Sequence, residues 1–518
     1  MGIQWLHENG TPADGGAVIN RNRRQNIDTM NAISVDVEIS DKLEKAKLEN
    51  GFYNLIDGER VSAGKTLSVV NPATGNQLAV VPDIDRVLLN KAVSAARKAF
   101  SGWRAVPFSQ RRAILTSLLD EISEHGEELI VLLTAERGGT LAQARWEIDL
   151  ITKALGPAVL QMELREEEQD VQYIGHITKR YTPIGVVGAI SPWNLPVFLS
   201  FTKILPALLA GNTVVLKPSP FTPLTVLRIA DYVHELLPPG VLNVVTGGDD
   251  LGPWITSHPG INLITFTGST FTGKRVLESA AATLKRVTLE LGGNDPGIVL
   301  SDAEPEKIAQ ALFDSMFLLC GQGCISLKRL YVHEDIYSRV IEALVAIASA
   351  TKVGDGFDPH SRLGPVQNQL QYKRLQSVWN EIKRSGAKVL FQGDVPTNTG
   401  GLFFPITLLD NPPDDASFVT QEVFGPIRSI FRYKNLDEAI RRANNTSYGL
   451  GASVWGSDSV QLRAVAAQLE AGTVWINQHS IRNPLVPASA YKESGLGVEF
   501  GPESLQSFCN LQVIAAKQ

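Results

Sequence analysis

Five short apolar segments, separated by longer amphipathic ones, occupy the middle of the chain and restrict its fold more than any other feature. They read "IGVVGAI", "NTVVLK", "VLNVV", "LITFTGS" and "VTLEL", between positions 184 and 291. Continuous apolar strands that alternate with helices are typical of a parallel sheet whose two faces are both covered. The pattern therefore predicts an α/β nucleotide-binding architecture. A second α/β stretch begins at about Gly292.

One amphipathic segment, "FTPLTVLRIADYVHELLPPG" (221–240), illustrates how the helices between these strands should begin and end. Thr222 can cap the first turn, and Pro223 suits the first helical position because an N–H is not needed there. Two prolines and a glycine at 238–240 stop the helix. Its apolar face is formed by Leu224, Leu227, Ala230, Val233 and Leu237.

Composition argues against several classes of protein. The chain has 518 residues and a net charge of −6 without a basic block, which makes nucleic-acid binding a poor prospect. Apolar runs fall short of the roughly 18–20 residues of a membrane helix. Three cysteines in so long a chain indicate a reducing compartment, with the cytoplasm as the default. Residues 1–50 lack the apolar core of a signal peptide and are predicted to be a mobile extension.

Two segments could contact a dinucleotide. "FTGSTFTG" (266–273) follows an apolar strand and opens a helix, so its small residues would let backbone N–H groups approach a pyrophosphate. An ordinary tight turn is the alternative for this segment. "LKPSP" places Lys217 at the carboxyl end of a strand, where ligands bind in open α/β sheets. Its amine could hold an adenosine ribose, or it could be a solvated lysine at a strand end.

Two further strand ends carry groups suited to catalysis. "SPWNLP" displays Asn194 between prolines, and an amide N–H there could stabilise a developing oxyanion. Turn formation is the alternative role for that asparagine. "LELGGN" places Glu290 before two glycines, where a carboxylate could move and accept a proton from water. A surface glutamate at a strand end is the alternative.

The segment "LCGQGCISLKRL" (319–330) holds two of the three cysteines. A metal site is not expected, because a second pair of cysteine or histidine ligands is missing. Cys320 ends an apolar run and is interpreted as a buried small hydrophobe. Cys324 follows "GQG", where a thiolate could meet a substrate, although the sequence shows no adjacent cation that would lower its pKa.

Taken together and in this order, the motifs resemble those of the aldehyde dehydrogenase superfamily from about Asn54 to Lys517. The motifs are "SPWNLP", "LKPS", "FTGSTFTG", "LELGGN", "GQGC", "QEVFGPI" and "NTSYGLGASVW". The text "KPSPFTPL" and "LKRLYVH" is similar to a bacterial and fungal subgroup. The resemblance implies that Cys324 is the nucleophile and Glu290 the base for the hydrolytic water. Asn194 and the Cys324 backbone N–H would then form the oxyanion hole.

The resemblance also implies a cofactor site for NAD or NADP. Lys217 and Ser219 would lie near the adenosine ribose, and Glu422 and Phe424 would hold the nicotinamide ribose and ring. The glycine segment would lie along the pyrophosphate. The cofactor-binding positions implied in addition to these are Trp193, Gly252, Gly268, Ser269, Gly273 and Leu291. A metal is not expected at this site.

The residue types suit the oxidation of an aldehyde even when the family resemblance is set aside. An aldehyde carbon releases hydride readily only after a nucleophile has added to it, and thiolate addition gives a thiohemiacetal that can do so. The product is a thioester, which a base-activated water cleaves to the carboxylic acid. We therefore expect NAD(P)-dependent oxidation of an aldehyde.

The resemblance further implies a division of the chain. A Rossmann-like cofactor domain would comprise 51–163 and 184–291, and a second α/β catalytic domain would comprise 292–486. Residues 164–183 and 487–518 would form a small β flap for oligomerisation, in a homodimer or homotetramer.

Three positions depart from the common family pattern. Pro220 replaces a glutamate that grips the ribose and repels a 2′-phosphate, so NADP is not excluded. "PASA" (487–490) replaces "PFGG" near the substrate mouth, and Gly323 gives the loop before the nucleophile extra freedom. The expected entrance of the substrate tunnel contributes four apolar side chains, which suit an apolar or aromatic aldehyde but could equally belong to the core. They are Leu195, Val197, Phe198 and Phe201.

Two other functions compete with this one. The chain could be a catalytically retired family member that acts as a binding or structural protein, but the three catalytic side chains are all present. It could also be a thiol esterase without a cofactor, which the intact "GSTFTG" and "QEVFGPI" segments argue against.

Overall fold

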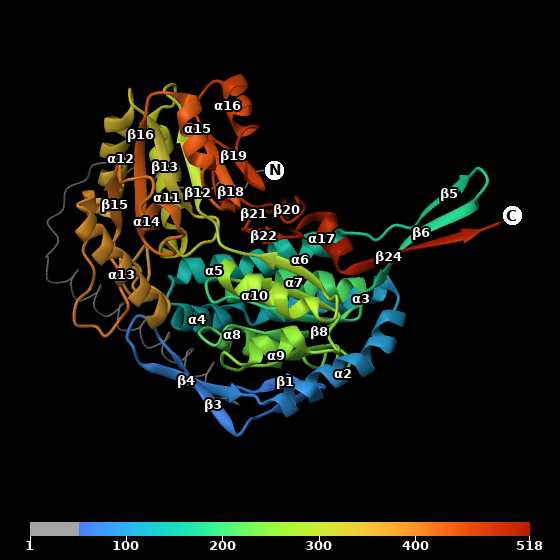
Figure 1. Ribbon diagram of the computed structural model, residues 1–518. Coiled ribbons are helices and arrows are strands. Elements are labelled where there is room, and N and C mark those ends of the chain that lie inside the picture. The colour runs from blue at the N-terminus through green and yellow to red at the C-terminus, as the bar shows by residue number, and fades with distance from the viewer. Residues whose placement is uncertain (1–50, 518) are drawn as a thin grey trace, which may run out of the picture.

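Two large sheets, each covered by helices, lie one above the other in Figure 1, and a narrow three-stranded arm projects from the lower part. The computed structural model describes residues 51–517, and the predicted extension 1–50 lies outside the described residues. Within 51–517, we find no helix that is long and apolar enough to span a membrane.

The lower sheet has eight strands in the order β2-β1-β9-β8-β7-β10-β11-β22. Its five central strands are parallel, as the apolar runs predict, and β1, β2 and β22 add antiparallel edges. The bounds are β1 Asn54–Ile56, β2 Glu59–Val61, β7 Val186–Ile190, β8 Thr213–Lys217, β9 Leu242–Val244, β10 Leu263–Thr267, β11 Arg286–Glu290 and β22 Gly495–Leu496.

Alternate residues of the central strands enter two different cores, which is why these strands are apolar throughout. Val187 of β7 and Val214 of β8 join one cluster, with helices α3, α7 and α8. Val186 and Val215 join the other, with α2, α9 and α10. The helices of this lobe are α2 Arg86–Ala105, α3 Phe108–Glu124, α4 Gly126–Arg137, α5 Leu141–Asp149, η1 Leu150–Leu155, α6 Gly156–Gln161, α7 Pro196–Ala210, α8 Leu224–Val233, α9 Leu251–Ser257 and α10 Thr270–Ala281.

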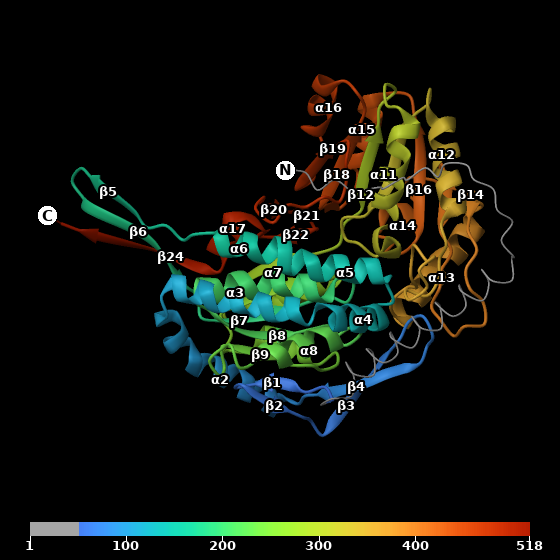
Figure 2. The same ribbon diagram turned by 180° about the vertical axis from the view of Figure 1, so that it is seen from behind.

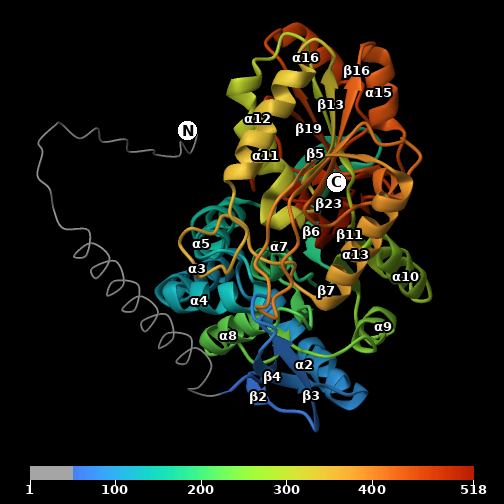
Figure 3. The same ribbon diagram turned by 90° about the vertical axis from the view of Figure 1, so that its left-hand side faces the viewer.

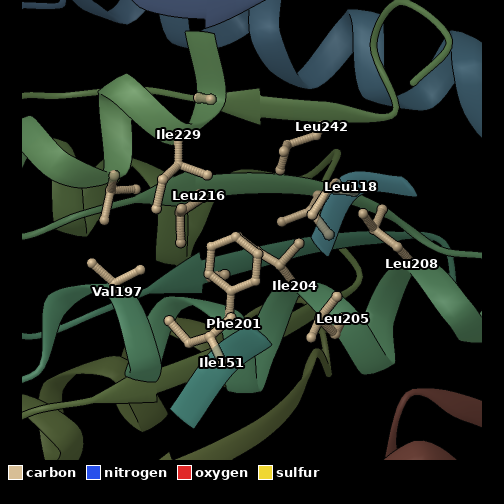
Figure 4. Close-up of a cluster of buried hydrophobic side chains, with 14 of the residues drawn as sticks. Leu118, Ile151, Val197, Phe201, Ile204, Leu205, Leu208, Leu216, Ile229 and Leu242 are labelled. Atoms are coloured by element: carbon tan, nitrogen blue, oxygen red, sulfur yellow. The ribbon is translucent and has the colours of Figure 1, made fainter. Parts of the chain in front are cut away.

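Helix α7 runs through the first of these cores and is buried along its whole length. Figure 4 shows Val197 and Phe201 among the packed side chains of this cluster, beside Ile151 and Leu216. Val197 and Phe201 therefore belong to the core, the alternative that the sequence left open beside a place at the tunnel entrance. Phe198 is also buried in this cluster, and Leu195 is partly buried against it.

Helix α8 begins one residue later than predicted. It spans Leu224–Val233, Pro223 is its cap residue, and no side chain caps it from within the segment. Instead, the buried carboxylate of Glu136 accepts hydrogen bonds from the N–H groups of Leu224 (2.7 Å) and Thr225 (2.9 Å). A distant carboxylate thus takes the place of the expected hydroxyl, and the Thr222 hydroxyl instead donates to the Trp193 carbonyl at 3.3 Å.

The upper sheet has seven strands in the order β14-β15-β16-β13-β12-β18-β19. Helices α11 and α12 cover one face, and α13, α15 and α16 cover the other. The strands are β12 Asp295–Val299, β13 Leu327–His333, β14 Lys388–Gln392, β15 Thr407–Asp410, β16 Ile427–Tyr433, β18 Gly451–Trp455 and β19 Thr473–Ile476. The helices are α11 Pro305–Phe317, η2 Leu318–Gly321, α12 Tyr337–Ala350, α13 Gln369–Ser385, α14 Ser417–Thr420, α15 Leu436–Asn444 and α16 Ser459–Ala466.

The arm is built from two distant parts of the chain. Figure 2 shows it extending away from both lobes, whereas in Figure 3 it points away from the viewer behind them, and its strand order is β24-β6-β5. β6 pairs with β24 along eight residue pairs, and Leu511, Val513 and Ile514 of β24 are exposed. The strands are β5 Glu167–Val171, β6 Gly175–Pro183 and β24 Cys509–Ala516.

Short elements complete the fold around and between these sheets. β3 and β4 form a hairpin, and the segment before β24 supplies small strands and one helix. They are β3 Lys65–Val70, β4 Gln77–Asp83, β17 Tyr448–Gly449, β20 Ala488–Ser489, β21 Tyr491–Lys492, β23 Val498–Glu499 and α17 Gly501–Ser507.

Candidate active site

The two cysteines lie in residues 318–326, the cysteine loop, which comprises η2 and the connection from η2 to β13. Cys320 lies within η2 and is buried in a left-handed conformation with φ 58°, whereas Cys324 lies in the connection and is partly exposed. Burial raises the pKa of the Cys320 thiol to about 12, and this suits the predicted role of a small hydrophobe. Burial also raises the pKa of the Cys324 thiol to about 11, but Lys328 and Arg482 oppose that shift. These are the neighbouring cations that the sequence order did not reveal.

Two glycines let this loop pass close to other groups. At Gly321, with φ 72°, a Cβ would lie 2.3 Å from the Gly425 carbonyl oxygen. At Gly323 a Cβ would lie 2.6 Å from the Ser326 hydroxyl, and its φ lies outside the left-handed range. Gly323 therefore provides space for Ser326, rather than only the conformational freedom that the sequence suggested.

The Asn194 amide reaches the same loop from the lower lobe. Asn194 follows β7, is buried, and donates from Nδ2 to the Gln322 carbonyl at 2.9 Å. Gln322 is itself fixed, since its amide donates to the Leu319 carbonyl and accepts from the Gln367 N–H. The predicted oxyanion donor thus contacts the chain two residues before the predicted nucleophile.

Glu290 ends β11, where a carboxylate is expensive to ionise. Its Oε1 atom is buried without a hydrogen-bond partner among the described residues. Burial, together with the nearby Glu499, raises the pKa of Glu290 to about 8, while Arg482 and Lys203 oppose this shift. A carboxylate with an unpaired oxygen and a pKa near neutrality is suited to accept a proton from water.

A buried ion pair beside Glu290 was not predicted. Lys203 of α7 donates from Nζ to Glu499 Oε1 at 2.6 Å and to Thr267 Oγ1 at 2.7 Å. Thr267 lies directly opposite Glu290 in the β10–β11 pairing. A lysine within the apolar text "VFLSFTKILPALL" was a usable signal, because a buried lysine needs an acidic partner. The sequence could not indicate that the partner lies 296 residues away.

The glycine segment lies between β10 and the first turn of α10. Ser269 is the cap residue of α10 and accepts a hydrogen bond from the Thr272 N–H, while Gly268 donates its N–H to the Glu290 carbonyl at 3.0 Å. At Gly273 a Cβ would lie 2.5 Å from the Leu291 side chain, so only glycine lets α10 pack closely there. Gly252 lies in α9, which contacts α10.

Lys217 ends β8 and, contrary to the solvated alternative, is buried. Burial lowers the pKa of Lys217 to about 8, and the acidic Asp249 and Asp83 partly offset this. Ser219 is also buried, and its hydroxyl accepts a hydrogen bond from the Phe221 N–H at 3.3 Å. A buried amine at the carboxyl end of a parallel strand is a suitable donor for ribose hydroxyls.

Glu422 and Phe424 extend from the upper lobe towards the same region. Glu422 Oε1 accepts from the Gly293 N–H at 3.2 Å, and a Cβ at Gly292 would lie 2.5 Å from its other oxygen. The Phe424 ring meets Trp193 edge-on, with ring centroids 5.3 Å apart. The capped helix end, the buried lysine, the close-packed glycines and this aromatic corner fit an extended dinucleotide.

Comparison with known proteins decides the family. The model of the aldehyde dehydrogenase family matches residues 60–514. The chain belongs to the aldehyde dehydrogenase family. Aldehyde dehydrogenase LUC3 of a Fusarium species is 36% identical to this chain over 465 residues, covering 89% of this chain and 98% of the relative. Phenylacetaldehyde dehydrogenase of Pseudomonas fluorescens is 38% identical over 475 residues, covering 88% of this chain and 93% of the relative.

A solved aldehyde dehydrogenase supports the same assignment. Betaine aldehyde dehydrogenase of Staphylococcus aureus in complex with NAD+ matches with a TM-score of 0.89 and 30% identity, covering 92% of this chain and 97% of that chain. The predicted resemblance, the α/β fold class and the NAD(P)-dependent aldehyde dehydrogenase class are thereby confirmed. An aldehyde substrate and an NAD(P) cofactor follow from the family.

Proposed function

We propose that this aldehyde dehydrogenase converts its aldehyde to the carboxylic acid through Cys324, with Asn194 and Glu290 as its catalytic partners. The observation that carries the proposal is the buried Oε1 atom of Glu290, which has no hydrogen-bond partner among the described residues, near a thiol that is partly exposed. Glu290 lies close enough to Cys324 to raise the pKa of that thiol. A buried carboxylate oxygen without a hydrogen bond destabilises the fold, so its presence beside the thiol supports a chemical role.

In the proposed mechanism, the Cys324 sulfur adds to the aldehyde carbon. The Asn194 amide and the Cys324 backbone N–H stabilise the oxyanion that forms. Lys217, Ser219, the glycine segment, Glu422 and Phe424 would hold the dinucleotide, which would accept the hydride that leaves the former aldehyde carbon, so that a thioester remains on Cys324. Glu290 then takes a proton from water, which attacks the thioester carbon and displaces the Cys324 thiolate.

The test of this proposal compares the two cysteines of the loop. Cys324→Ala should abolish reduction of NAD or NADP by an aldehyde, whereas Cys320→Ala should keep most of it, because its thiol is buried. A wild-type protein that binds cofactor but never reduces it would favour the retired family member. Ester hydrolysis that proceeds without any cofactor would favour the thiol esterase. Equal loss of activity in both folded variants would refute the role of Cys324.

We also propose that NAD and NADP both serve as cofactors. The residue three positions after Lys217 is Pro220, which has no carboxylate to repel a 2′-phosphate. The kcat/KM values should therefore differ by less than about tenfold. Pro220→Glu should selectively weaken NADP use. A thousandfold rejection of NADP by the parent protein would show that another group excludes the phosphate.

For the substrate, we propose an apolar or aromatic aldehyde. Its support is the partly buried Leu195 beside Asn194 and the substrate named for the Pseudomonas relative, phenylacetaldehyde. Arg482, which influences the pKa values of both Cys324 and Glu290, favours a competing class of aldehydes that carry a carboxylate. Comparing kcat/KM for matched aromatic and carboxylate-bearing aldehydes separates the two classes.

We propose that the arm formed by β5, β6 and β24 joins copies of the chain into a homodimer or homotetramer. Its exposed apolar residues support this, and sedimentation of the purified protein tests it. The three cysteines are free thiols, which supports the cytoplasm as the compartment.

A further inference from the structure

Lys328, the second residue of β13, is a buried cation with three partners at the active site. Its side chain is 3% exposed. Its Nζ donates to the Gly323 carbonyl at 3.0 Å and to the Cys324 carbonyl at 2.6 Å. The same nitrogen lies 3.2 Å from Glu422 Oε1. An ammonium group has three N–H donors, so these three acceptors account for all of them.

Holding the cysteine loop in place does not by itself explain the three contacts of Lys328, because Arg428 already holds that loop. The Arg428 guanidinium, also buried, donates to the Gly321 carbonyl at 3.1 Å and to the Gly425 carbonyl at 2.7 Å. It thereby links the cysteine loop to the segment that carries Glu422. All the hydrogen bonds that Arg428 donates go to main-chain carbonyls. Lys328 differs in holding the nucleophile itself and in facing a carboxylate.

The charges around the Cys324 thiol depend on this lysine. The ionisable groups that influence the thiol are two cations, Lys328 and Arg482, and two carboxylates, Glu422 and Glu290. Lys328 lowers the pKa of Cys324 more than Arg482 does, against the larger opposing effect of burial. Without Lys328, one cation would face two carboxylates, which disfavours the thiolate.

We propose that Lys328 is a positioning residue that holds the main chain of Cys324 and the carboxylate of Glu422 together, and thereby links the thiolate to the cofactor side of the site. This inference rests on the proposed function, in which Glu422 contacts the nicotinamide ribose. The carboxylate that would receive the ribose is thus paired with the cation that stabilises the nucleophile.

The test measures the reactivity of Cys324 directly, without an aldehyde. Iodoacetamide alkylation is followed as a function of pH, and mass spectrometry quantifies the peptide that contains Cys324. In Lys328→Met the alkylation profile should move to higher pH, so that the rate at pH 7.5 falls by about tenfold or more. Lys328→Arg, which keeps the charge, should recover part of that loss. Lys285→Met removes a buried lysine whose Nζ donates to the Thr283 hydroxyl, and its profile should match the parent.

A second variant covers the case in which Lys328→Met fails to fold. Lys328→Met combined with Glu422→Gln removes both members of the ion pair, so no buried carboxylate is left unpaired. A charge balance acting through Lys328 predicts that the double variant still alkylates more slowly than Glu422→Gln alone. It also predicts a higher KM for NAD or NADP, with the KM for the aldehyde changed less.

Unchanged alkylation profiles in the folded variants would overturn the inference and leave Lys328 as a structural residue. The outcome is separable from the proposed function. A parent protein that alkylates as predicted but oxidises no aldehyde would refute the proposed reaction and retain the role of Lys328.

Discussion

Two partly buried glutamates, Glu290 and Glu422, influence the pKa of the Cys324 thiol, and their surroundings differ. Glu422 has a cation, Lys328, and a backbone N–H from Gly293 as partners. Glu290 has a buried oxygen without a hydrogen-bond partner in the described part of the chain, and another carboxylate, Glu499, near it. Burial raises the pKa of both carboxyl groups, and at Glu422 the Lys328 cation and the Gly293 N–H oppose that shift. The difference indicates that one carboxylate is positioned for binding and the other is left free to exchange a proton.

Of the substitutions that test this difference between Glu290 and Glu422, Glu290→Gln should have the largest effect. The amide cannot take a proton from water, so steady-state kcat should fall by roughly a hundredfold or more. The first turnover does not need the hydrolytic water. Rapid mixing should therefore show a burst of reduced cofactor close to one per active site. If neither a burst nor a Cys324 adduct forms, Glu290 acts in activating the thiol instead.

Glu422→Gln should have a smaller effect, mainly on cofactor binding. The amide lacks the charge that pairs with Lys328 and that we propose accepts ribose hydroxyls, so KM for NAD or NADP should rise about tenfold. The aldehyde KM serves as the internal control. A fall in kcat with an unchanged cofactor KM would contradict the assignment of Glu422 to binding.

The unpaired carboxylate should also reduce stability in a pH-dependent way. The pKa of Glu290 is raised from 4.5 to about 8, so folding favours its neutral form. The stability that comes from that neutral form is complete below about pH 4.5 and is lost as the pH rises through about 8. Glu290→Gln cannot ionise and should melt at a higher temperature than the parent at pH 9, by a few degrees. The two melting curves should converge near pH 5, and a constant difference at all pH values would contradict this explanation.

The smallest expected effects are two shifts of opposite sign. Lys203 lowers the pKa of Glu290 and Glu499 raises it. Lys203→Met should therefore move the rising limb of the kcat profile to higher pH, and Glu499→Gln should move it to lower pH. Each shift should be on the order of one pH unit. Shifts in the same direction would indicate a general structural disturbance, for which the melting temperatures are the control.

Local patterns were sufficient to predict the framework of the site. The apolar runs correspond to β7 to β11, because a strand buried on both faces must be apolar at every position. Asn194, Lys217 and Glu290 follow or end three of those strands, so their nearness could be expected from parallel pairing. Their assigned roles came from the family resemblance and stay predictions until the variants are measured.

The partners of the catalytic groups could not be predicted, because they come from distant parts of the chain. Glu136 caps α8 from 88 residues away, and Glu499 meets Lys203 from 296 residues away. Lys328 was present in the quoted motif, four residues after Cys324, but its orientation depends on how β13 leaves the loop. The sequence could not distinguish whether Val197 and Phe201 lie in the core or at the tunnel entrance, because apolar side chains occur in both places.

The edge strand β22 has a consequence for how the protein is made. Gly495 pairs with Glu290 at the end of β11, and the Leu291 N–H bonds to the Ser494 carbonyl at 2.8 Å. A ribosome synthesises β11 about two hundred residues before β22, so a nascent chain carries an incomplete sheet edge during the synthesis of those residues. Only when the last part of the chain emerges can Glu499 also reach Lys203. The environment of the proposed base is thus assembled last, and a chain that ends shortly before Ser494 would lack the partner strand of Glu290 and the carboxylate of Glu499.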